Sequence, residues 1–270
     1  MRLGLLGGGA MGEAIIAAVT SGDEPVAQPQ DVCVFDVMVP RLKFLQETYS
    51  VRLASTPAEL AAESDFVLLS VKPQDFERAA GPMSGKLGDT TTLSIMAGVT
   101  LARLGRVLQS DRLVRAMPNT PAQIGQGMTG WTATDAVDES AREGARRIFG
   151  AMGKEAYVPD EKYLDMVTGL SGSGPAYVFL FIEALTDAGV HVGLPRDIAY
   201  TMALQTVIGS ALYAEKTGKH PADLRNQVTS PGGTTAEGLR ALEQGNLRSD
   251  VLEAVIAAFE KSRALGEEAK

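Results

Sequence analysis

The sequence predicts an α/β protein with a doubly wound parallel sheet domain followed by an all-helical C-terminal domain. Short apolar runs rich in β-branched residues alternate with helical stretches as far as residue 158. A glycine-rich turn directly follows the first of these runs and leads into an apolar helix, as in the first βα unit of a doubly wound sheet. After residue 160 the alternation stops, and only helical patterns follow.

The predicted strands are apolar on both faces, which is typical of a parallel sheet covered by helices on each side. They are Leu3–Leu6, Val32–Phe35, Phe66–Val71, Thr92–Ile95, Leu113–Met117 and Ala156–Val158. The helices predicted between them are Met11–Thr20, Arg41–Thr48, Ala58–Glu63, Phe76–Met83, Leu101–Leu108 and Glu139–Phe149. We therefore expect residues 1–160 to form the sheet domain.

Residues 161–270 are predicted to contain helices only, separated by glycine and proline. These helices are Ala176–Val192, Arg196–Glu215, Ala222–Gln227, Thr235–Gln244 and Leu247–Leu265. Apolar side chains surround most of each helix, and a segment of roughly 110 residues buries limited area by itself. We therefore expect this domain to cover its apolar surface with a partner.

Composition excludes several classes of partner. The chain has 25 Lys and Arg against 33 Asp and Glu, a net charge of −8, so binding to nucleic acid or an anionic membrane is not expected. The longest apolar run, Ala176–Ile182, is too short to span a bilayer. Cys33 is the only cysteine and is expected to be reduced and buried. With no secretion signal at the N-terminus, we expect a soluble, cytoplasmic protein.

The glycine-rich turn matches the pattern G-x-G-x-x-G with Gly7, Gly9 and Gly12. The first glycine permits a tight turn, the second lets the backbone approach a pyrophosphate, and the third allows close packing of helix on strand. Ala10 and Met11 would point the first N–H groups of the helix at this anion. Because the pattern lies between a strand and a helix, it predicts a Rossmann-like dinucleotide site rather than a merely structural turn.

Asp36 ends the second strand, 24 residues beyond Gly12, about where a carboxylate holds the ribose of NAD. The alternative is that Asp36 is a solvated turn or helix-cap residue. Three further segments follow predicted strands, where open α/β sheets bind ligands. Their candidate cofactor-binding residues are Val71, Lys72, Pro73, Ala97, Gly98, Pro118 and Asn119. The alternatives are that Lys72 is a surface lysine without a role and that the other segments are simple turns at strand ends.

The helical half contains two segments dense in glycine and hydroxyl residues. Gly169–Tyr177, which includes Ser173, is predicted to be a loop that leads into a helix, and Thr229–Thr235 also precedes a helix. Helix N-termini and short hydroxyls bind a small carboxylate well, although both segments could serve only as helix caps. The two histidines, His191 and His220, lie in no metal-like or nucleophilic arrangement, so no metal is expected.

These motifs together resemble those of the pyrroline-5-carboxylate reductases. The resemblance rests on GGGAMG at 7–12, VKP at 71–73, RAMPNTP at 115–121, GLSGSGPAY at 169–177 and, above all, VTSPGGTT at 228–235. It implies that NAD(P)H reduces 1-pyrroline-5-carboxylate to L-proline, the last step of proline biosynthesis. It also implies a homodimer formed by intertwined helical domains, often assembled further. Residues 1–160 would then bind the dinucleotide, and residues 161–270 would bind substrate and dimerise.

The resemblance also implies roles for the loop at 228–235. The Thr235 hydroxyl would hydrogen-bond the ring nitrogen and is the catalytic candidate, while Ser230 and the backbone of Gly232, Gly233 and Thr234 would hold the carboxylate. Whether Thr235 donates a proton or only orients the ring stays open, because a hydroxyl is a poor acid near neutral pH.

The chain departs from the family pattern at two positions. Many members carry Ser, Asn or Arg after the second strand, whereas this chain has Asp36-Val37-Met38 and no arginine before Arg41. A carboxylate repels a 2′-phosphate, so we expect a preference for NADH over NADPH. Pro57 also replaces a common asparagine near the adenosine. Alternative functions are a dinucleotide-dependent enzyme of the same fold that acts on another small imine or on a 3-hydroxy acid, and dinucleotide sensing without turnover.

Overall fold

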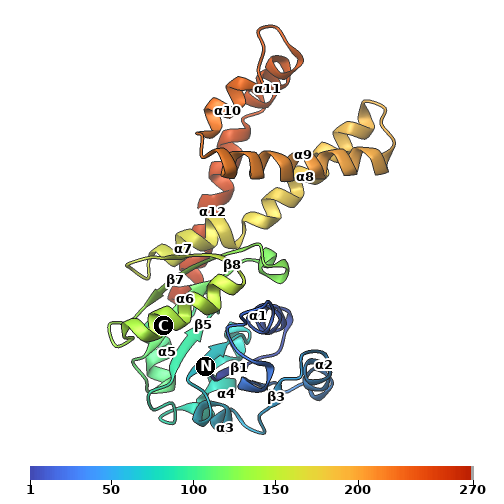
Figure 1. Cartoon of the computed structure of the whole chain (residues 1–270). Coiled ribbons are helices and arrows are strands. Elements are labelled where there is room, and N and C mark those ends of the chain that lie inside the picture. Colours follow the sequence, from blue (N-terminus) through green and yellow to red (C-terminus); the bar gives the residue numbers. More distant parts are fainter. Residues whose placement is uncertain (269–270) are drawn as a thin grey trace. The chain divides into compact units, whose positions relative to one another are not determined.

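The structure, a computed structural model, describes residues 1–268. Contacts divide the chain into two compact units, one formed by Met1–Ser173 with the segment from Ala257 onward and the other by Gly174–Ile256 (Figure 1). We call them the sheet unit and the helical unit. None of the described helices is long and apolar enough to cross a membrane.

The sheet unit is built on one eight-stranded sheet with the order β3-β2-β1-β4-β5-β6-β7-β8. The strands are β1 Leu3–Leu6, β2 Val32–Phe35, β3 Arg52–Leu53, β4 Phe66–Leu69, β5 Thr91–Ser94, β6 Leu113–Met117, β7 Gly127–Ala133 and β8 Gly153–Tyr157. The first six strands are parallel, β7 runs antiparallel to β6, and β8 is parallel to β7. The predicted doubly wound parallel sheet is therefore confirmed for β1 to β6.

Helices cover both faces of the sheet. The α-helices of this part are α1 Ala10–Thr20, α2 Val39–Tyr49, α3 Pro57–Ala62, α4 Phe76–Ala80, α5 Leu101–Leu108, α6 Glu139–Ala151 and α7 Tyr163–Val167. Alternate residues of a strand enter opposite cores, because strand side chains point to alternate faces. Leu5 packs in the same core as Ile15 and Trp131, and Leu6 packs in the other core with Phe76.

Two strands of the sheet, β3 and β7, are absent from the sequence-based prediction. Two glycines, Gly127 and Gly130, interrupt β7 and favour a turn by composition. In the structure they permit close packing, since a Cβ on Gly130 would lie 2.8 Å from the Val167 side chain of α7. Trp131, which follows Gly130, is fully buried and packs on Phe149. Packing of the whole sheet, which no local pattern reveals, decides this strand.

The helical unit contains α8 Gly174–His191, α9 Arg196–Thr217, α10 Pro221–Gln227, α11 Thr234–Gln244 and the first part of α12 Leu247–Glu268. Helices α8 and α9 form a hairpin in which Gly189 meets Ala199; a Cβ on Gly189 would lie 2.9 Å from the Ala199 Cβ. Of the large apolar side chains on this unit, many are exposed: Val178, Phe179, Leu180, Phe181, Ile198, Tyr200, Met202, Ile208, Leu212, Tyr213, Leu242, Val251, Leu252 and Ile256. Such a surface is typical of an oligomer interface.

The division by contacts lies later in the sequence than the predicted boundary at 160/161. Residues 161–173 stay with the sheet because Arg115 on β6 pairs with Glu161, at 2.7 Å between Nη1 and Oε1. The end of α12 also belongs to the sheet unit, where the Ser262 hydroxyl donates to Asp165 Oδ1 at 2.7 Å. The roles assigned to residues 1–160 and 161–270 remain predictions.

We expect Arg115→Met to lower the free energy of unfolding by about 2 kcal/mol, because it leaves the carboxylates of Glu161 and Asp165 without their cationic partner. The Arg115 side chain is 6% exposed, and those carboxylates retain partial contact with solvent, which limits the loss. The measurement is urea unfolding. Arg78→Met is the matched control. The Arg78 side chain, which pairs with Asp75, is 80% exposed, so this ion pair should contribute less than about 0.5 kcal/mol to the free energy of unfolding. Equal effects of the two substitutions would contradict the prediction.

Candidate active site

The glycine turn after β1 has the geometry that its sequence predicts. Gly7 has a positive φ of 104°, and a Cβ there would lie 2.9 Å from the Ser70 carbonyl. The Ser70 hydroxyl donates to the Gly7 carbonyl oxygen at 2.6 Å. A Cβ on Gly12 would lie 2.4 Å from the same oxygen. Gly7 and Gly12 therefore let β1, β4 and α1 approach closely.

Gly9 differs, because a Cβ there would meet nothing within 4 Å and its φ of −64° suits any residue. Gly9 is the N-cap of α1 and no side chain caps this helix. Within residues 1–268, the N–H groups of Ala10 and Met11 have no hydrogen-bond acceptor. Open space beside uncapped N–H groups fits the pyrophosphate of a dinucleotide.

Asp36 lies beside this turn, as predicted. Its Oδ2 accepts from the Gly8 N–H at 2.7 Å and its Oδ1 accepts from the Met38 N–H at 2.8 Å. The carboxylate therefore holds the start of α2 against the glycine turn. A carboxylate oxygen can accept a second hydrogen bond, so this structural role leaves capacity for a ribose hydroxyl.

The other predicted cofactor residues also follow the carboxyl ends of strands. Val71, Lys72 and Pro73 follow β4, and Lys72 is exposed. Ala97 and Gly98 follow β5, where Gly98 has a positive φ of 72° and a Cβ there would lie 3.1 Å from the Leu265 Cβ of α12. The positive φ therefore favours glycine at 98, and the close packing of α12 within the sheet unit leaves little room for a side chain there.

Pro118 and Asn119 follow β6, and the Asn119 side chain is part of a structural network. Its amide donates to the Ser171 carbonyl oxygen at 3.1 Å, and its Oδ1 accepts from the Met128 N–H at 2.9 Å. Asn119 thereby connects the end of β6, the start of β7 and the segment after α7. The sequence analysis did not identify this role, which depends on residues far apart in the chain.

The helix predicted from Ala176 is confirmed, but the prediction of a loop before it is wrong, because residues 169–172 are helical as well. A π-helical turn spans Thr168–Gly172, and α8 begins at Gly174. The Ser173 N–H donates to the Thr168 carbonyl oxygen at 2.8 Å, five residues back, which is the π-helical pattern. Glycine favours a loop by propensity, but the hydrogen bonds of Asn119 to Ser171 favour the helical turn here. Ser173 is half-buried at its end.

The second segment, Thr229–Thr235, precedes a helix as predicted. The Gly233 N–H donates to the Ser230 carbonyl oxygen at 3.1 Å, and Gly232 has a positive φ of 67° that this turn requires. Helix α11 begins at Thr234 and has Gly233 as N-cap, with no side-chain cap. Within residues 1–268, the hydroxyls of Ser230, Thr234 and Thr235 make no hydrogen bond.

Within the described part of the chain, these features leave N–H groups and hydroxyls without partners at the start of α11, which is the chemistry that an anion site needs. Uncapped N–H groups of a helix attract a carboxylate, and the hydroxyls of the turn add donors. The alternative of simple helix capping is not what the structure shows, because no side chain caps α11. Thr235 is half-buried in the first turn.

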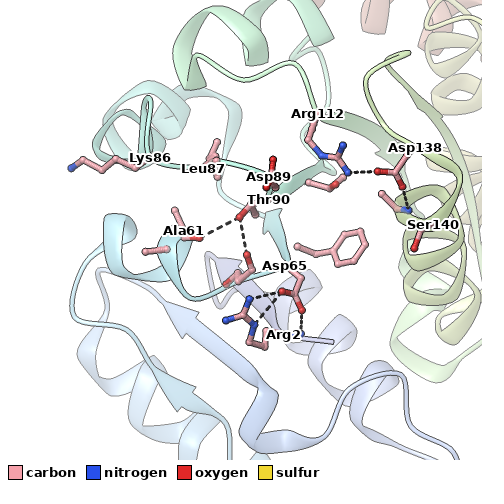
Figure 2. Close-up of a pocket in the computed structure, with 16 residues that line it drawn as sticks. Arg2, Ala61, Asp65, Lys86, Leu87, Asp89, Thr90, Arg112, Asp138 and Ser140 are labelled. Atoms are coloured by element: carbon pink, nitrogen blue, oxygen red, sulfur yellow. Dashed lines mark hydrogen bonds and ion pairs between the residues drawn. The ribbon is translucent and has the colours of Figure 1, made fainter.

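A hollow in the sheet unit lies away from the carboxyl ends of the strands. It measures about 540 Å³ and is lined by residues before β1, β4, β5 and β6, at the amino ends of these strands (Figure 2). Arg2 pairs there with Asp65, and Arg112 pairs with Asp138. Ligands bind open α/β sheets at the carboxyl ends, so this hollow is not the candidate site. No group of three or more metal-ligating side chains occurs within residues 1–268.

Known proteins share these features over the whole chain. Residues 161–265 match the family described as "Pyrroline-5-carboxylate reductase dimerisation", and residues 2–98 match "NADP oxidoreductase coenzyme F420-dependent". The pyrroline-5-carboxylate reductase of Synechocystis sp. is 44% identical over 266 residues, which cover 98% of each chain. The chain belongs to the pyrroline-5-carboxylate reductase family. The resemblance drawn from the motifs is thus confirmed.

Solved pyrroline-5-carboxylate reductases also have the same fold. The reductase of Coxiella burnetii is 33% identical with a TM-score of 0.92, and each chain is covered to 98%. The Plasmodium falciparum reductase, solved with NADP bound, is 31% identical with a TM-score of 0.88 and the same coverage. The predicted combination of a Rossmann-like sheet with a helical C-terminal region is confirmed.

Proposed function

We propose that the chain reduces 1-pyrroline-5-carboxylate to L-proline with NAD(P)H, the last step of proline biosynthesis. Membership of the reductase family supports this function, and full-length relatives named for it support the same reaction. The observation that carries the proposal is the uncapped start of α11 at Thr229–Thr235, where a small carboxylate and a ring nitrogen find donors side by side.

The dinucleotide is proposed to bind along the carboxyl ends of the parallel strands. The N–H groups of Ala10 and Met11 hold the pyrophosphate beside Gly9, and Asp36 holds the adenosine ribose. The remaining proposed contacts come from Val71, Lys72, Pro73, Ala97, Gly98, Pro118 and Asn119. When bound, NAD(P)H supplies the hydride that reduces the C=N bond.

The start of α11 is proposed to bind the substrate. Ser230 and the backbone N–H groups of Gly232, Gly233 and Thr234 hold the carboxylate, Ser173 is a further substrate-binding candidate, and the Thr235 hydroxyl hydrogen-bonds the ring nitrogen. Hydride addition to the imine carbon leaves the electron pair of the C=N bond on nitrogen, which carries a proton in the product. The protein supplies orientation to this reaction, and a protonated imine accepts hydride most readily.

We further propose that the reductase is a homodimer or larger homo-oligomer and that it is cytoplasmic. The exposed apolar side chains on α8, α9 and α12 are a surface that a second copy would cover. The match of residues 161–265 to a dimerisation family supports the same assembly.

The experiment that tests the function is the loss of NAD(P)H absorbance when 1-pyrroline-5-carboxylate is added, with proline identified as the product. Turnover is expected with this substrate. Dinucleotide binding without turnover would favour a sensing protein instead. Turnover with a different cyclic imine alone would overturn the substrate assignment.

We expect a higher kcat/KM with NADH than with NADPH, since the Asp36 carboxylate repels a 2′-phosphate. Initial rates with both cofactors at several concentrations measure this preference. Asp36→Asn should reduce the ratio of kcat/KM with NADH to kcat/KM with NADPH, because the asparagine side chain has the shape of aspartate but no negative charge. Equal or better efficiency of the original protein with NADPH would contradict the prediction.

A further inference from the structure

Arg41, in the first turn of α2, lies against the glycine turn. Its Nε donates to the Gly8 carbonyl oxygen at 2.5 Å, and its Nη2 lies 3.4 Å from the Gly9 carbonyl oxygen. The Phe44 ring lies beside the guanidinium, 5.0 Å from its carbon to the ring centroid. The side chain is 27% exposed, so solvent still reaches this cation.

Glu13 holds Arg41 in this position. Its carboxylate forms an ion pair with the guanidinium and accepts a hydrogen bond from the Tyr49 hydroxyl at 2.9 Å. Both contacts lower the pKa of Glu13, chiefly the hydrogen bond from Arg41. Glu13 therefore stays ionised and cancels the charge of Arg41 near neutral pH. The sequence analysis did not identify this network.

Arg41 and Asp36 flank Gly8. A Cβ built on Gly8 would lie 3.6 Å from Asp36 Oδ2 and 3.7 Å from Arg41 Cγ. Arg41 is the first cation after β2, and the next, Lys43, is paired with Glu47 along α2 at 3.7 Å. Arg41 is thus the cation of this segment that would meet a phosphate on the ribose proposed for Asp36, provided that its guanidinium leaves the glycine turn.

We propose that Glu13 is a specificity-determining residue that disfavours NADP(H), because it keeps Arg41 on the glycine turn and away from a 2′-phosphate. The inference rests on the proposed function, since it concerns the dinucleotide of that reaction. Two groups would then set the cofactor preference. The carboxylate of Asp36 repels a 2′-phosphate, and the guanidinium of Arg41 is bound to Glu13 and does not reach the phosphate.

The test is the binding of NAD+ and NADP+ to the full-length protein by titration calorimetry, without substrate. Glu13→Gln should lower the ratio of Kd for NADP+ to Kd for NAD+ by about fivefold, because a charge-assisted phosphate contact becomes available to Arg41. Removing a negative charge near the start of α1 also favours the pyrophosphate, but that effect is common to both dinucleotides and cancels in the ratio.

Two further variants distinguish the release of Arg41 from a general loss of order around the glycine turn. Tyr49→Phe removes the other hydrogen bond of Glu13 while keeping the ion pair, so the ratio should change less than about twofold. In the background of Arg41→Met, Glu13→Gln should leave the ratio unchanged, because no guanidinium remains to be released. Loss of stability does not disturb the comparison, since both dinucleotides bind the folded protein and the folded fraction cancels.

Three outcomes overturn the inference: an unchanged ratio in Glu13→Gln, an equal shift in Tyr49→Phe, or the same shift when Arg41 is replaced by Met. Each leaves the proposed function intact provided that the original protein binds either dinucleotide. Failure of the original protein to bind NAD+ and NADP+ would instead overturn the proposed function.

Discussion

Replacing Thr235 with Ala should reduce kcat/KM for 1-pyrroline-5-carboxylate by about 100-fold, because the ring nitrogen loses its hydrogen-bond partner and its fixed orientation. Thr235 lies in the first turn of α11, and its hydroxyl makes no hydrogen bond within residues 1–268. The substitution therefore removes no hydrogen bond that the described residues make. Steady-state rates and thermal unfolding together measure the effect.

Two substitutions serve as controls for Thr235. Thr235→Ser keeps the hydroxyl and should retain activity within about fivefold. Thr229→Ala removes a hydroxyl from the same loop, one that donates to the Arg225 carbonyl oxygen at 2.7 Å, and should change kcat/KM less than about threefold. Activity of Thr235→Ala close to that of the original protein would remove Thr235 from the reaction.

The same added methyl group should affect the stability of the protein differently at two glycines of the glycine turn. Gly12→Ala places a Cβ 2.4 Å from the Gly7 carbonyl oxygen, so α1 must move away from the sheet. We expect its Tm to fall by roughly 5 °C and dinucleotide binding to be lost with it. Gly9→Ala should leave Tm unchanged, because nothing lies within 4 Å of the new atom.

The methyl of Gly9→Ala instead occupies the space proposed for the pyrophosphate, so Kd for NAD+ should rise at least about tenfold. Calorimetric titration and thermal unfolding of both variants test the pair. Unchanged binding by Gly9→Ala would place the dinucleotide elsewhere on the sheet unit. An unchanged Tm for Gly12→Ala would show that α1 adjusts without cost.

The features predicted correctly from sequence are those in which local pattern and tertiary packing agree. Leu3–Leu6 is apolar throughout and is buried on both faces, so its strand and the glycine turn behind it follow from the residues alone. β7 was missed because its glycines serve close contacts with residues far along the chain, Gly127 with Met152 and Gly130 with Val167 of α7, which no local pattern reveals. The turn at 168–172 was misjudged for a related reason, since Asn119, in another part of the chain, hydrogen-bonds its Ser171.

The residues of the candidate site differ in the same way, since some have a local sequence signal and others do not. Gly7, Gly9 and Gly12 have spacing that is itself the signal, and their geometry agrees with it. Arg41 and Glu13 carry no such signal, because their partnership joins α1 to α2 across 28 residues. The only hint in the sequence is that Arg41 follows the second strand five residues after Asp36, the residue proposed to hold the ribose.

The segment of α12 from Ala257 onward has a consequence for how the protein is made. It packs on Gly98 and holds Asp165 through Ser262, yet it follows the helical unit in the sequence. On the ribosome, residues 1–173 emerge well before this last piece of their own unit. The sheet unit therefore completes its packing only after the helical unit has been synthesised, and a chain released at residue 256 would leave Gly98 and Asp165 without these partners.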